Sequence, residues 1–282
     1  MPIRPASADD IDAIVDLFRA RDRAAFGQAE VKRRYIAAAF ELASTDHFVA
    51  DSNGVAGYAA LNGSQEVVIV GERGHELLAA LEERATERGF SQVTAIIAGQ
   101  DERFDALVRE AGFDHHGDVL RMWRSLSEPF AEAVWPEGVT VRTYGAADAA
   151  TVLALLDAAY AWDETHASLP LDEWVQWMTG DVEFDAALWF LAERENELVA
   201  CALHWDAIDG RGWVKDLAVR ADERGRGLGA ALLRHGFAAY AARGASGVGL
   251  KVDATNPTGA VRLYEREGFT VDRTYGHWAK TL

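Results

Sequence analysis

The sequence predicts an α/β protein of two similar domains, each a mixed, mostly antiparallel sheet flanked by helices. One observation behind this is a strand-to-helix entry that occurs twice, with acid in the first helical turn near Asp10 and again near Asp148. Acid is favourable there against the helix dipole. A second is a late helix that ends at a glycine before a last strand, at Gly112 and again at Gly268. Repetition over this length predicts two domains rather than one.

The elements are expected to follow the order β-α-α-β-β-β-α-β-α-β in each half. The three consecutive strands of that order are predicted at residues 47–50, 55–61 and 66–70, and again at 188–192, 198–205 and 213–219. Residues 1–126 are predicted as the first domain, 127–138 as a linker and 139–282 as the second domain. Pro136 favours a boundary there, and Trp135 predicts that the linker is packed.

The composition is typical of a globular protein, with 49% hydrophobic and 26% charged residues among 282. The formal net charge of −17 argues against broad electrostatic binding to nucleic acid. An acidic field attracts cationic amines, or it serves only to keep the protein in solution. No apolar run reaches the roughly 18–20 residues that span a bilayer, and the N-terminus lacks the apolar stretch of a signal peptide. We therefore expect a cytoplasmic protein without a membrane or nucleic-acid partner.

Cys201 is the only cysteine, so an internal disulfide and a cysteine-based zinc site are both excluded. It lies in the apolar run 198–203, which predicts a core residue rather than a nucleophile. His166 has no second histidine at ligand spacing. No metal is expected.

A glycine-rich turn at residues 224–229 carries the strongest chemical signal. It follows the strand at 213–219 and opens a helix, so its backbone N–H groups would lie at the positive end of the helix dipole, where a pyrophosphate binds. Arg224 and Arg226 add positive charge. The alternatives are an ordinary glycine-rich helix start and a dinucleotide-binding turn, but the latter follows the first strand of a βαβ unit. Here the turn follows a fourth strand.

Two motifs in this half resemble those of the GCN5-related N-acetyltransferase (GNAT) superfamily. The acetyl-CoA motif is matched by Val219, Arg224, Gly227 and Gly229. The downstream motif is matched by Asn256 and by the segment 260–269, which contains Tyr264 and ends in Gly268 and Phe269. The resemblance covers 139–282 and implies two tandem GNAT-like domains, acetyl-CoA as acyl donor, and direct transfer of the acyl group to an amine.

The resemblance also implies roles for individual residues. Tyr264 would protonate the departing thiolate, the alternative being a structural tyrosine on an apolar helix face. Asn256 would bind the pantetheine arm, and the strand at 213–219 would splay from its neighbour at 248–252 to open a slot. The residues expected to contact CoA are Leu217, Ala218, Val219, Arg224, Gly225, Arg226, Gly227, Leu228, Gly229, Ala230 and Asn256.

The general base and the acceptor site are less determined. Amine acetyltransferases of this superfamily often have Glu-Asp where this chain has Lys215 and Asp216. Neighbouring side chains of a regular strand point to opposite faces, and we favour Asp216 as the base, acting directly or through water. Lys215 facing the cleft would instead suit an acceptor with a carboxylate or phosphate. Trp162 and Asp163 would bind a cationic amine through cation–π contact and charge, unless the aromatic residues of this region only pack a helix.

The first domain resembles a degenerate copy. Its turn at 70–76 is shorter, and Glu72 and Glu76 would repel a pyrophosphate. Its last helix has no tyrosine at the position that matches Tyr264. We expect this domain to be non-catalytic and to complete the acceptor cleft or act as a built-in dimer partner, in a monomer with an internal pseudo-dimer or in a homodimer. Among tandem members, the arrangement resembles mycothiol synthase of actinobacteria.

The leading hypothesis is an acetyl-CoA-dependent N-acetyltransferase that acts on a primary amine of a small, cationic acceptor. Candidate acceptors are a mycothiol-precursor-like amine, polyamines, antibiotics and peptide N-termini. The alternative from another class is a non-catalytic acyl-CoA-binding sensor or docking module. Tyr264 favours the enzyme, whereas the unsettled base favours the module.

Overall fold

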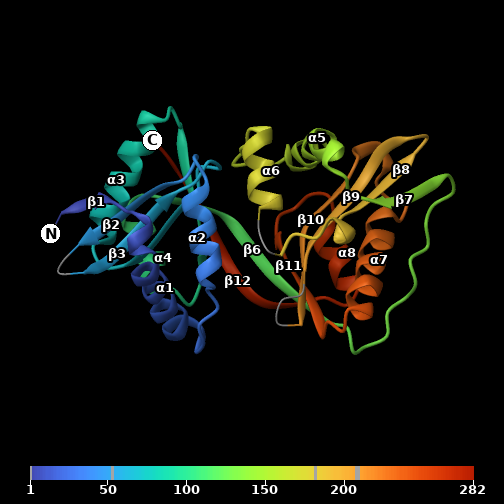
Figure 1. The fold of residues 1–282 in the computed structure, drawn as a ribbon, viewed down its shortest axis with the longest axis horizontal. Helices are drawn as coiled ribbons and strands as arrows, with labels where there is room; N and C mark the ends of the chain where they lie inside the picture. The colour runs from blue at the N-terminus through green and yellow to red at the C-terminus, as the bar shows by residue number, and fades with distance from the viewer. Residues whose placement is uncertain (1, 52–53, 181–182, 207–209) are drawn as a thin grey trace. The chain divides into compact units, whose positions relative to one another are not determined.

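The computed structural model describes residues 2–51, 54–180, 183–206 and 210–282. The chain divides into two compact units: unit 1 comprises Met1–Asp118 with Thr274–Leu282, and unit 2 comprises Val119–Arg273. The predicted order of strands and helices occurs twice along the chain (Figure 1). The predicted fold class, two α/β domains built on sheets flanked by helices, is confirmed.

Unit 1 contains an antiparallel sheet in the order β1-β2-β3-β4. Alternate residues of β3 face different cores: Ala59 and Leu61 pack with α3 and α4, whereas Tyr58 and Ala60 pack with α1. Helices therefore cover both faces. The elements are β1 (Ile3–Pro5), α1 (Ile11–Phe26), α2 (Arg33–Glu41), β2 (Asp46–Asp51), β3 (Val55–Leu61), β4 (Val67–Gly71), α3 (Gly74–Glu87), β5 (Gln92–Ala98) and α4 (Glu102–Glu110).

Unit 2 repeats this plan. Its strands lie in the order β6-β11-β10-β9-β8-β7, and β10 is parallel to β11 and antiparallel to β9. Along β9, Ala200 and Ala202 pack with α7 and α8, whereas Cys201 and Leu203 pack with α5 and α6. The elements are β6 (Asp114–Ser125), β7 (Val139–Thr143), α5 (Ala149–Tyr160), α6 (Leu171–Thr179), β8 (Phe190–Arg194), β9 (Glu197–Trp205), β10 (Arg211–Val219), α7 (Leu228–Ala242), β11 (Gly247–Asp253), α8 (Ala260–Arg266) and β12 (Thr270–Thr281).

The division into units differs from the predicted domain boundaries. The second half of β12 belongs to unit 1, where Tyr275–Thr281 pairs with β5, although residues 139–282 were expected to form one domain. Likewise the second half of β6 pairs with β11 in unit 2. A strand satisfies its backbone groups at any open sheet edge, and the sequence does not specify which edge that is.

The expected linker, residues 127–138, belongs to unit 2. Its Phe130 ring lies 5.7 Å from the ring of Phe237, and its Trp135 ring lies 5.8 Å from the ring of His235. Both partners are on α7. The segment is packed against the helix that begins at the glycine-rich turn.

Both units begin with the same charged corner. In unit 1, Arg4 donates to both oxygens of Asp10 at 2.8 Å, and Asp10 also accepts from the backbone N–H of the residue three positions earlier. In unit 2, Arg142 and Asp148 make the same contacts at 2.7 and 2.8 Å. The guanidinium groups hold the pKa of Asp10 at about 2 and keep the pKa of Asp148 below its ordinary value. The shared corner supports an internal duplication.

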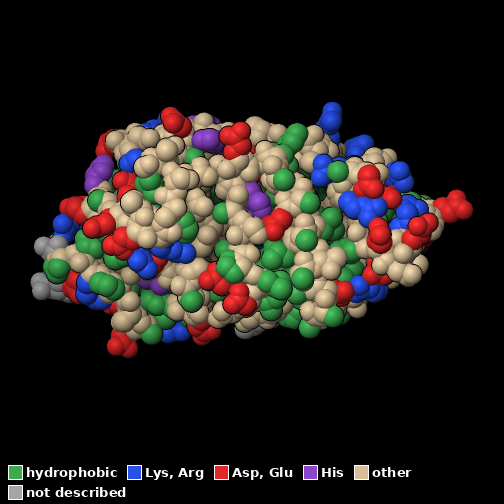
Figure 2. All heavy atoms as spheres, turned by 90° about the horizontal axis from the view of Figure 1, so that it is seen from above, with side chains coloured by type: hydrophobic (Ala, Val, Ile, Leu, Met, Phe, Trp, Pro, Cys, Tyr) green, Lys and Arg blue, Asp and Glu red, His purple; other side chains and the backbone are tan. Residues whose placement is uncertain are grey.

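The apolarity of the helices and the mixture of charged side chains on the surface are those of a globular protein, as the composition indicates. Among the described residues, no helix is both long enough and apolar enough to cross a membrane. On the face drawn in Figure 2, acidic and basic side chains are interspersed.

A buried histidine lies in the core of unit 2. His204 is fully buried on β9, with the rings of Phe190 and Tyr240 at 5.5 and 5.4 Å. Within the described part of the chain, neither ring nitrogen has a hydrogen-bond partner. Burial, and then the proximity of His235, lowers the pKa of His204 to about 3. The folded state therefore holds this ring neutral.

Because the unfolded chain binds a proton at His204 in a pH range where the folded chain does not, stability should rise with pH between about 3 and 6.5. We expect the free energy of unfolding to fall by about 2 kcal/mol more in the native chain than in a His204→Leu variant when the pH drops from 6 to 4. Urea unfolding of both proteins at the two pH values measures this difference. Equal losses in the two proteins would contradict the assignment.

Candidate active site

A cavity of about 890 Å³ lies in unit 2. Its walls are the ends of β10 and β11, the turn before α7, the first turns of α7, the segment 256–267 and the end of α5. We call it the unit 2 cavity. It brings together segments that are far apart in the sequence, and both motifs singled out from the sequence line it.

The cavity exists because two parallel strands stop pairing. Among the described residues, the last pair in the β10–β11 ladder is Val214–Leu250, although β10 continues to Val219 and β11 to Asp253. On its other edge, β10 pairs with β9 as far as Val219. The second half of β10 therefore presents one edge of main-chain groups to the cavity. This is the expected splay between the two strands.

A bulge lies where the two strands separate. The register of β10 against β9 shifts between Val214 and Asp216, which leaves Lys215 as an extra residue. A bulge increases the local twist of a strand and changes the direction of its side chains. The opposite-face rule for neighbouring side chains therefore does not apply at Lys215 and Asp216.

The turn before α7 has the geometry of an anion site. Gly225 and Gly227 have φ of 76° and 89°, in the left-handed region that glycine adopts without strain. Among the described residues, and leaving aside each glycine's neighbours in the chain, no atom lies within 4 Å of where a Cβ would stand at either residue, so the backbone is open to a ligand. The first turn of α7 carries no acid. Its orphan N–H groups and the helix dipole suit a pyrophosphate.

Arginines surround this turn. The Arg224 Nε donates to the Val219 carbonyl at 3.1 Å, which ties the loop back to the end of β10. Glu223 is buried, and its carboxylate is paired with Arg194 at 3.1 Å and with Arg226 at 3.3 Å. The buried acid directly before the turn is thus matched by the guanidinium groups of Arg194 and Arg226.

Asn256 lines the cavity at the start of the segment that leads into α8. Its side-chain carbonyl accepts hydrogen bonds from the N–H and the hydroxyl of Thr258, at 2.9 and 2.5 Å. Because the carbonyl is engaged in this turn, the group that Asn256 can offer to a ligand is its amide NH2.

Asp216 and two tyrosines, Tyr160 and Tyr264, form the chemical centre of the candidate site. Tyr160, at the end of α5, donates its hydroxyl to Asp216 Oδ1 at 2.9 Å. Tyr264, on α8, is buried, and burial together with the Asp216 charge raises its pKa. Burial and the same carboxylate raise the pKa of Tyr160 well above its ordinary value. Both phenols therefore stay protonated at neutral pH.

Most of the residues predicted for the site line the cavity. These are Trp162, Asp163, Leu217, Ala218, Val219, Arg224, Gly225, Arg226, Gly227, Leu228, Gly229, Ala230, Asn256 and Tyr264. Asp216 and Lys215 are not among the lining residues. The Lys215 Nζ lies 4.6 Å from the ring centroid of Trp177 and 5.6 Å from that of Trp205, and 3.9 Å from Asp216.

The structure adds lining residues to which the sequence assigned no role in the site. Val134, Trp135 and Pro136 of the expected linker line the cavity. Tyr160 lines it too, and its hydrogen bond to Asp216 crosses 56 positions of sequence. The signal available for two of these residues was aromatic character: Trp135 was expected to pack, and Tyr160 lies two positions before Trp162.

Among the described residues, no group of three or more His, Cys, Asp or Glu side chains is arranged to hold a metal ion. Cys201 is buried, and burial raises its pKa, so its thiol is held neutral in the core.

Comparison with known proteins agrees with this geometry. The acetyltransferase (GNAT) family matches residues 150–269. A mycothiol acetyltransferase of Thermobispora bispora is 34% identical over 234 residues, which cover 78% of each chain. One of Kineococcus radiotolerans is 34% identical over 287 residues, covering 94% of this chain and 91% of that protein. The chain belongs to the GNAT acetyltransferase family.

Solved structures extend the GNAT likeness to both units. A GCN5-related N-acetyltransferase of Sphaerobacter thermophilus is 26% identical, with a TM-score of 0.75, and the match covers 99% of this chain and 95% of that one. A tandem GNAT protein of the clavulanic acid biosynthesis pathway has a TM-score of 0.76 at 16% identity and covers 99% and 98%. That likeness shows the fold alone. The protein is thus a tandem GNAT acyltransferase, and the predicted family and class of enzyme are confirmed.

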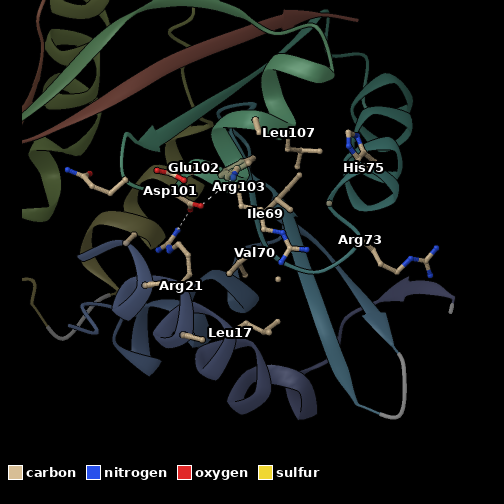
Figure 3. Close-up of a pocket in the computed structure, with 18 of the residues that line it drawn as sticks. Leu17, Arg21, Ile69, Val70, Arg73, His75, Asp101, Glu102, Arg103 and Leu107 are labelled. Atoms are coloured by element: carbon tan, nitrogen blue, oxygen red, sulfur yellow. Dashed lines mark hydrogen bonds and ion pairs between the residues drawn. The ribbon is translucent and has the colours of Figure 1, made fainter. Parts of the chain in front are cut away.

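Unit 1 has a pocket of about 820 Å³ between α1, the end of β4, the start of α3 and α4. Figure 3 shows Arg21 and Asp101 facing one another at one end of this pocket, with Arg73 and His75 at the other. Counted back from the Gly-Phe pair that ends each helix, Val108 occupies the position of Tyr264. Val108 is fully buried and supplies no acid.

The start of α3 differs from that of α7 at the anion site. Arg73 has φ of 60°, a conformation that favours glycine, where unit 2 has Gly227. The Glu76 carboxylate accepts from its own backbone N–H and from Arg73 at 2.9 Å, and these bonds lower the pKa of Glu76. A Leu107 methyl group packs within 2.8 Å of where a Cβ would stand at Gly74. A carboxylate of the chain itself thus lies where a phosphate would bind.

Gly227→Glu should weaken acetyl-CoA binding at least about 100-fold, because it places a carboxylate at the open, positively polarised turn. Isothermal titration calorimetry with CoA and acetyl-CoA measures the loss. Gly244→Glu is the matched control, because Gly244 has φ of 76° and equally open surroundings but lies outside the cavity lining. Equal losses in both variants would mean that backbone strain, not the anion site, explains the effect.

We also expect one acetyl-CoA to bind per chain, because Glu76 occupies the anion site of unit 1. Calorimetry on the full chain should give a stoichiometry near one, and the Gly227→Glu variant should show no remaining site. A single intact site in that variant would assign binding to unit 1 and contradict the prediction.

Proposed function

We propose that unit 2 transfers the acetyl group of acetyl-CoA directly to a primary amine of a small, cationic acceptor. The observation that carries this proposal is the convergence of three features on one cavity: the separated ends of β10 and β11, the open glycine turn of α7, and the buried phenol of Tyr264. Unit 1 is proposed to be non-catalytic.

The donor site follows from the fit between the cavity and CoA. The N–H groups of residues 225–230 would hold the pyrophosphate, and Arg224 and Arg226 would add charge. The free edge of β10, from Leu217 to Val219, would pair with the amides of the pantetheine arm, and Asn256 would donate its NH2 to the same arm. The Val219 carbonyl already accepts from Arg224, so its remaining lone pair is what it can offer.

The chemistry requires that protons move in two directions. The acceptor ammonium loses one proton to Asp216, either directly or through an intervening hydroxyl, and its nitrogen then attacks the thioester carbonyl. As the C–S bond breaks, the Tyr264 hydroxyl donates a proton to the sulfur, and the second proton lost by the nitrogen restores Tyr264. Acid–base assistance of this kind is worth roughly 10²–10⁴-fold in rate. The proton on Asp216 returns to solvent.

The acceptor is proposed to lie against the end of α5. Tyr160, Trp162 and Asp163 line the cavity there, and a carboxylate beside aromatic rings suits an ammonium group. The relatives named mycothiol acetyltransferase make an amine of a mycothiol precursor the first acceptor to test. The names of these relatives as enzymes also favour turnover over a module that only binds acyl-CoA.

The test is release of CoA thiol from acetyl-CoA in the presence of single amines: the mycothiol precursor, spermidine, an aminoglycoside and a peptide with a free N-terminus. We expect turnover with at least one cationic small amine and formation of an N-acetyl product detectable by mass spectrometry. Tight CoA binding without turnover on any of these amines would favour the non-catalytic module.

Tyr264→Phe should lower kcat about 100-fold and leave the affinity for CoA unchanged, because it removes one hydroxyl and keeps the ring that packs against Phe269. Steady-state kinetics and calorimetry measure the two quantities separately. An unchanged kcat would show that the departing sulfur takes its proton from elsewhere.

A further inference from the structure

Asp216 is screened from the unit 2 cavity by a tyrosine. Tyr160 lines the cavity, whereas Asp216 is not among its lining residues, and the Asp216 side chain is only 13% exposed. The Tyr160 hydroxyl donates to Asp216 Oδ1 at 2.9 Å. An amine in the cavity therefore meets the phenol before it meets the carboxylate.

We propose that Tyr160 is a further catalytic residue, whose hydroxyl passes the proton of the acceptor ammonium to Asp216. This inference rests on the proposed function of unit 2 and names the group that connects the acceptor to its base. The motifs that place the chain in its family do not contain Tyr160, and they do not indicate a proton path from the acceptor to Asp216.

The relay balances as a concerted exchange of two protons. One N–H bond of the ammonium breaks and an O–H bond forms at Tyr160 Oη. The original O–H bond of Tyr160 breaks and an O–H bond forms at Asp216 Oδ1. Tyr160 begins and ends as a neutral phenol, the acceptor becomes a neutral amine, and Asp216 becomes a neutral acid.

A relay suits this phenol better than a role as an ionised base. Burial and the Asp216 charge raise the pKa of Tyr160 well above its ordinary value, so a free phenolate is disfavoured at working pH. Its hydroxyl hydrogen is already directed at the carboxylate, which leaves the oxygen lone pairs to accept from the cavity side. The group is set to accept one proton as it gives another.

The charged and titratable groups around the pair come from several elements. On β10, the Lys215 Nζ lies 3.9 Å from Asp216. The Tyr264 hydroxyl on α8 and the Cys201 thiol on β9 interact electrostatically with the pair. The His166 ring lies 5.5 Å from that of Tyr160 and is bonded to Asp157 at 3.0 Å.

The test compares Tyr160→Phe with Tyr144→Phe. Tyr144 is a buried tyrosine of the same apolar cluster as Tyr160, and it lies outside the cavity lining. The readout is kcat/KM for the mycothiol precursor or, if that is not accepted, for the best amine of the panel, from pH 7.5 to 9.5. Affinity for acetyl-CoA is measured on each variant.

We expect Tyr160→Phe to lower kcat/KM about 100-fold at pH 7.5, with acetyl-CoA affinity and the Tyr144→Phe control unchanged. The loss should shrink to less than about tenfold at pH 9.5, because more of the acceptor is then already a free amine and needs no base. A loss of the same size at every pH would assign Tyr160 a structural role and overturn the relay.

Asp216→Asn separates failure of the relay from failure of the proposed function. If both hold, Asp216→Asn shows the same pH-dependent loss, and the double variant is no worse than either single variant, because both remove one path. A loss in Asp216→Asn with none in Tyr160→Phe overturns the relay and keeps Asp216 as the base. No loss in either variant overturns both assignments, as does absence of turnover on every amine.

Discussion

The separation of β10 from β11 after Val214 and Leu250 is the constraint on which the rest of the candidate site depends. The extra residue at Lys215 adds twist to β10 while β10 remains paired with β9, so the strand leaves β11 without leaving the sheet. This separation forgoes ladder hydrogen bonds and leaves main-chain donors and acceptors exposed at one edge. Unmade hydrogen bonds are costly, and a ligand with amides of its own, such as a pantetheine arm, can satisfy them.

The duplication shows which parts of this arrangement the fold needs and which parts serve ligand binding. Both units keep the Arg–Asp corner at the first helix and the apolar faces that hold helices on both sides of the sheet. They differ at the helix that follows the fourth strand, where unit 1 has Glu76 bonded within its own turn and unit 2 has an open glycine backbone. A helix N-terminus gains from an anion whether a side chain or a ligand supplies it. Unit 1 thus satisfies the N-terminus of α3 with a carboxylate of its own.

The sequence was sufficient to predict features with a local cause. The order of elements follows from apolar periodicity, and the turn at Gly225 and Gly227 follows from glycine itself. Features set by tertiary pairing were not predictable: the exchange of the end of β12 into unit 1, and the presence of Trp135 in the cavity wall. The directions in which the Lys215 and Asp216 side chains point were likewise not predictable from the sequence. Period-two alternation assigns one of them to the cleft, but the bulge cancels that rule, and neither residue lines the cavity.

The strand separation also explains how the charge of the Asp216 carboxylate acts on the hydroxyls of both Tyr160 and Tyr264. Tyr160 is on α5, which packs on one face of the sheet, and Tyr264 is on α8, which packs on the other. A continuous ladder would keep side chains on the two faces of a sheet apart. Where β10 leaves β11, both tyrosines line one cavity, and Asp216 raises the pKa of each. Two neutral phenols beside a largely buried carboxylate can accept and donate protons without adding a further charge to the site, whose desolvation would be costly. The gap proposed to admit the donor therefore also brings together the groups proposed to move the protons.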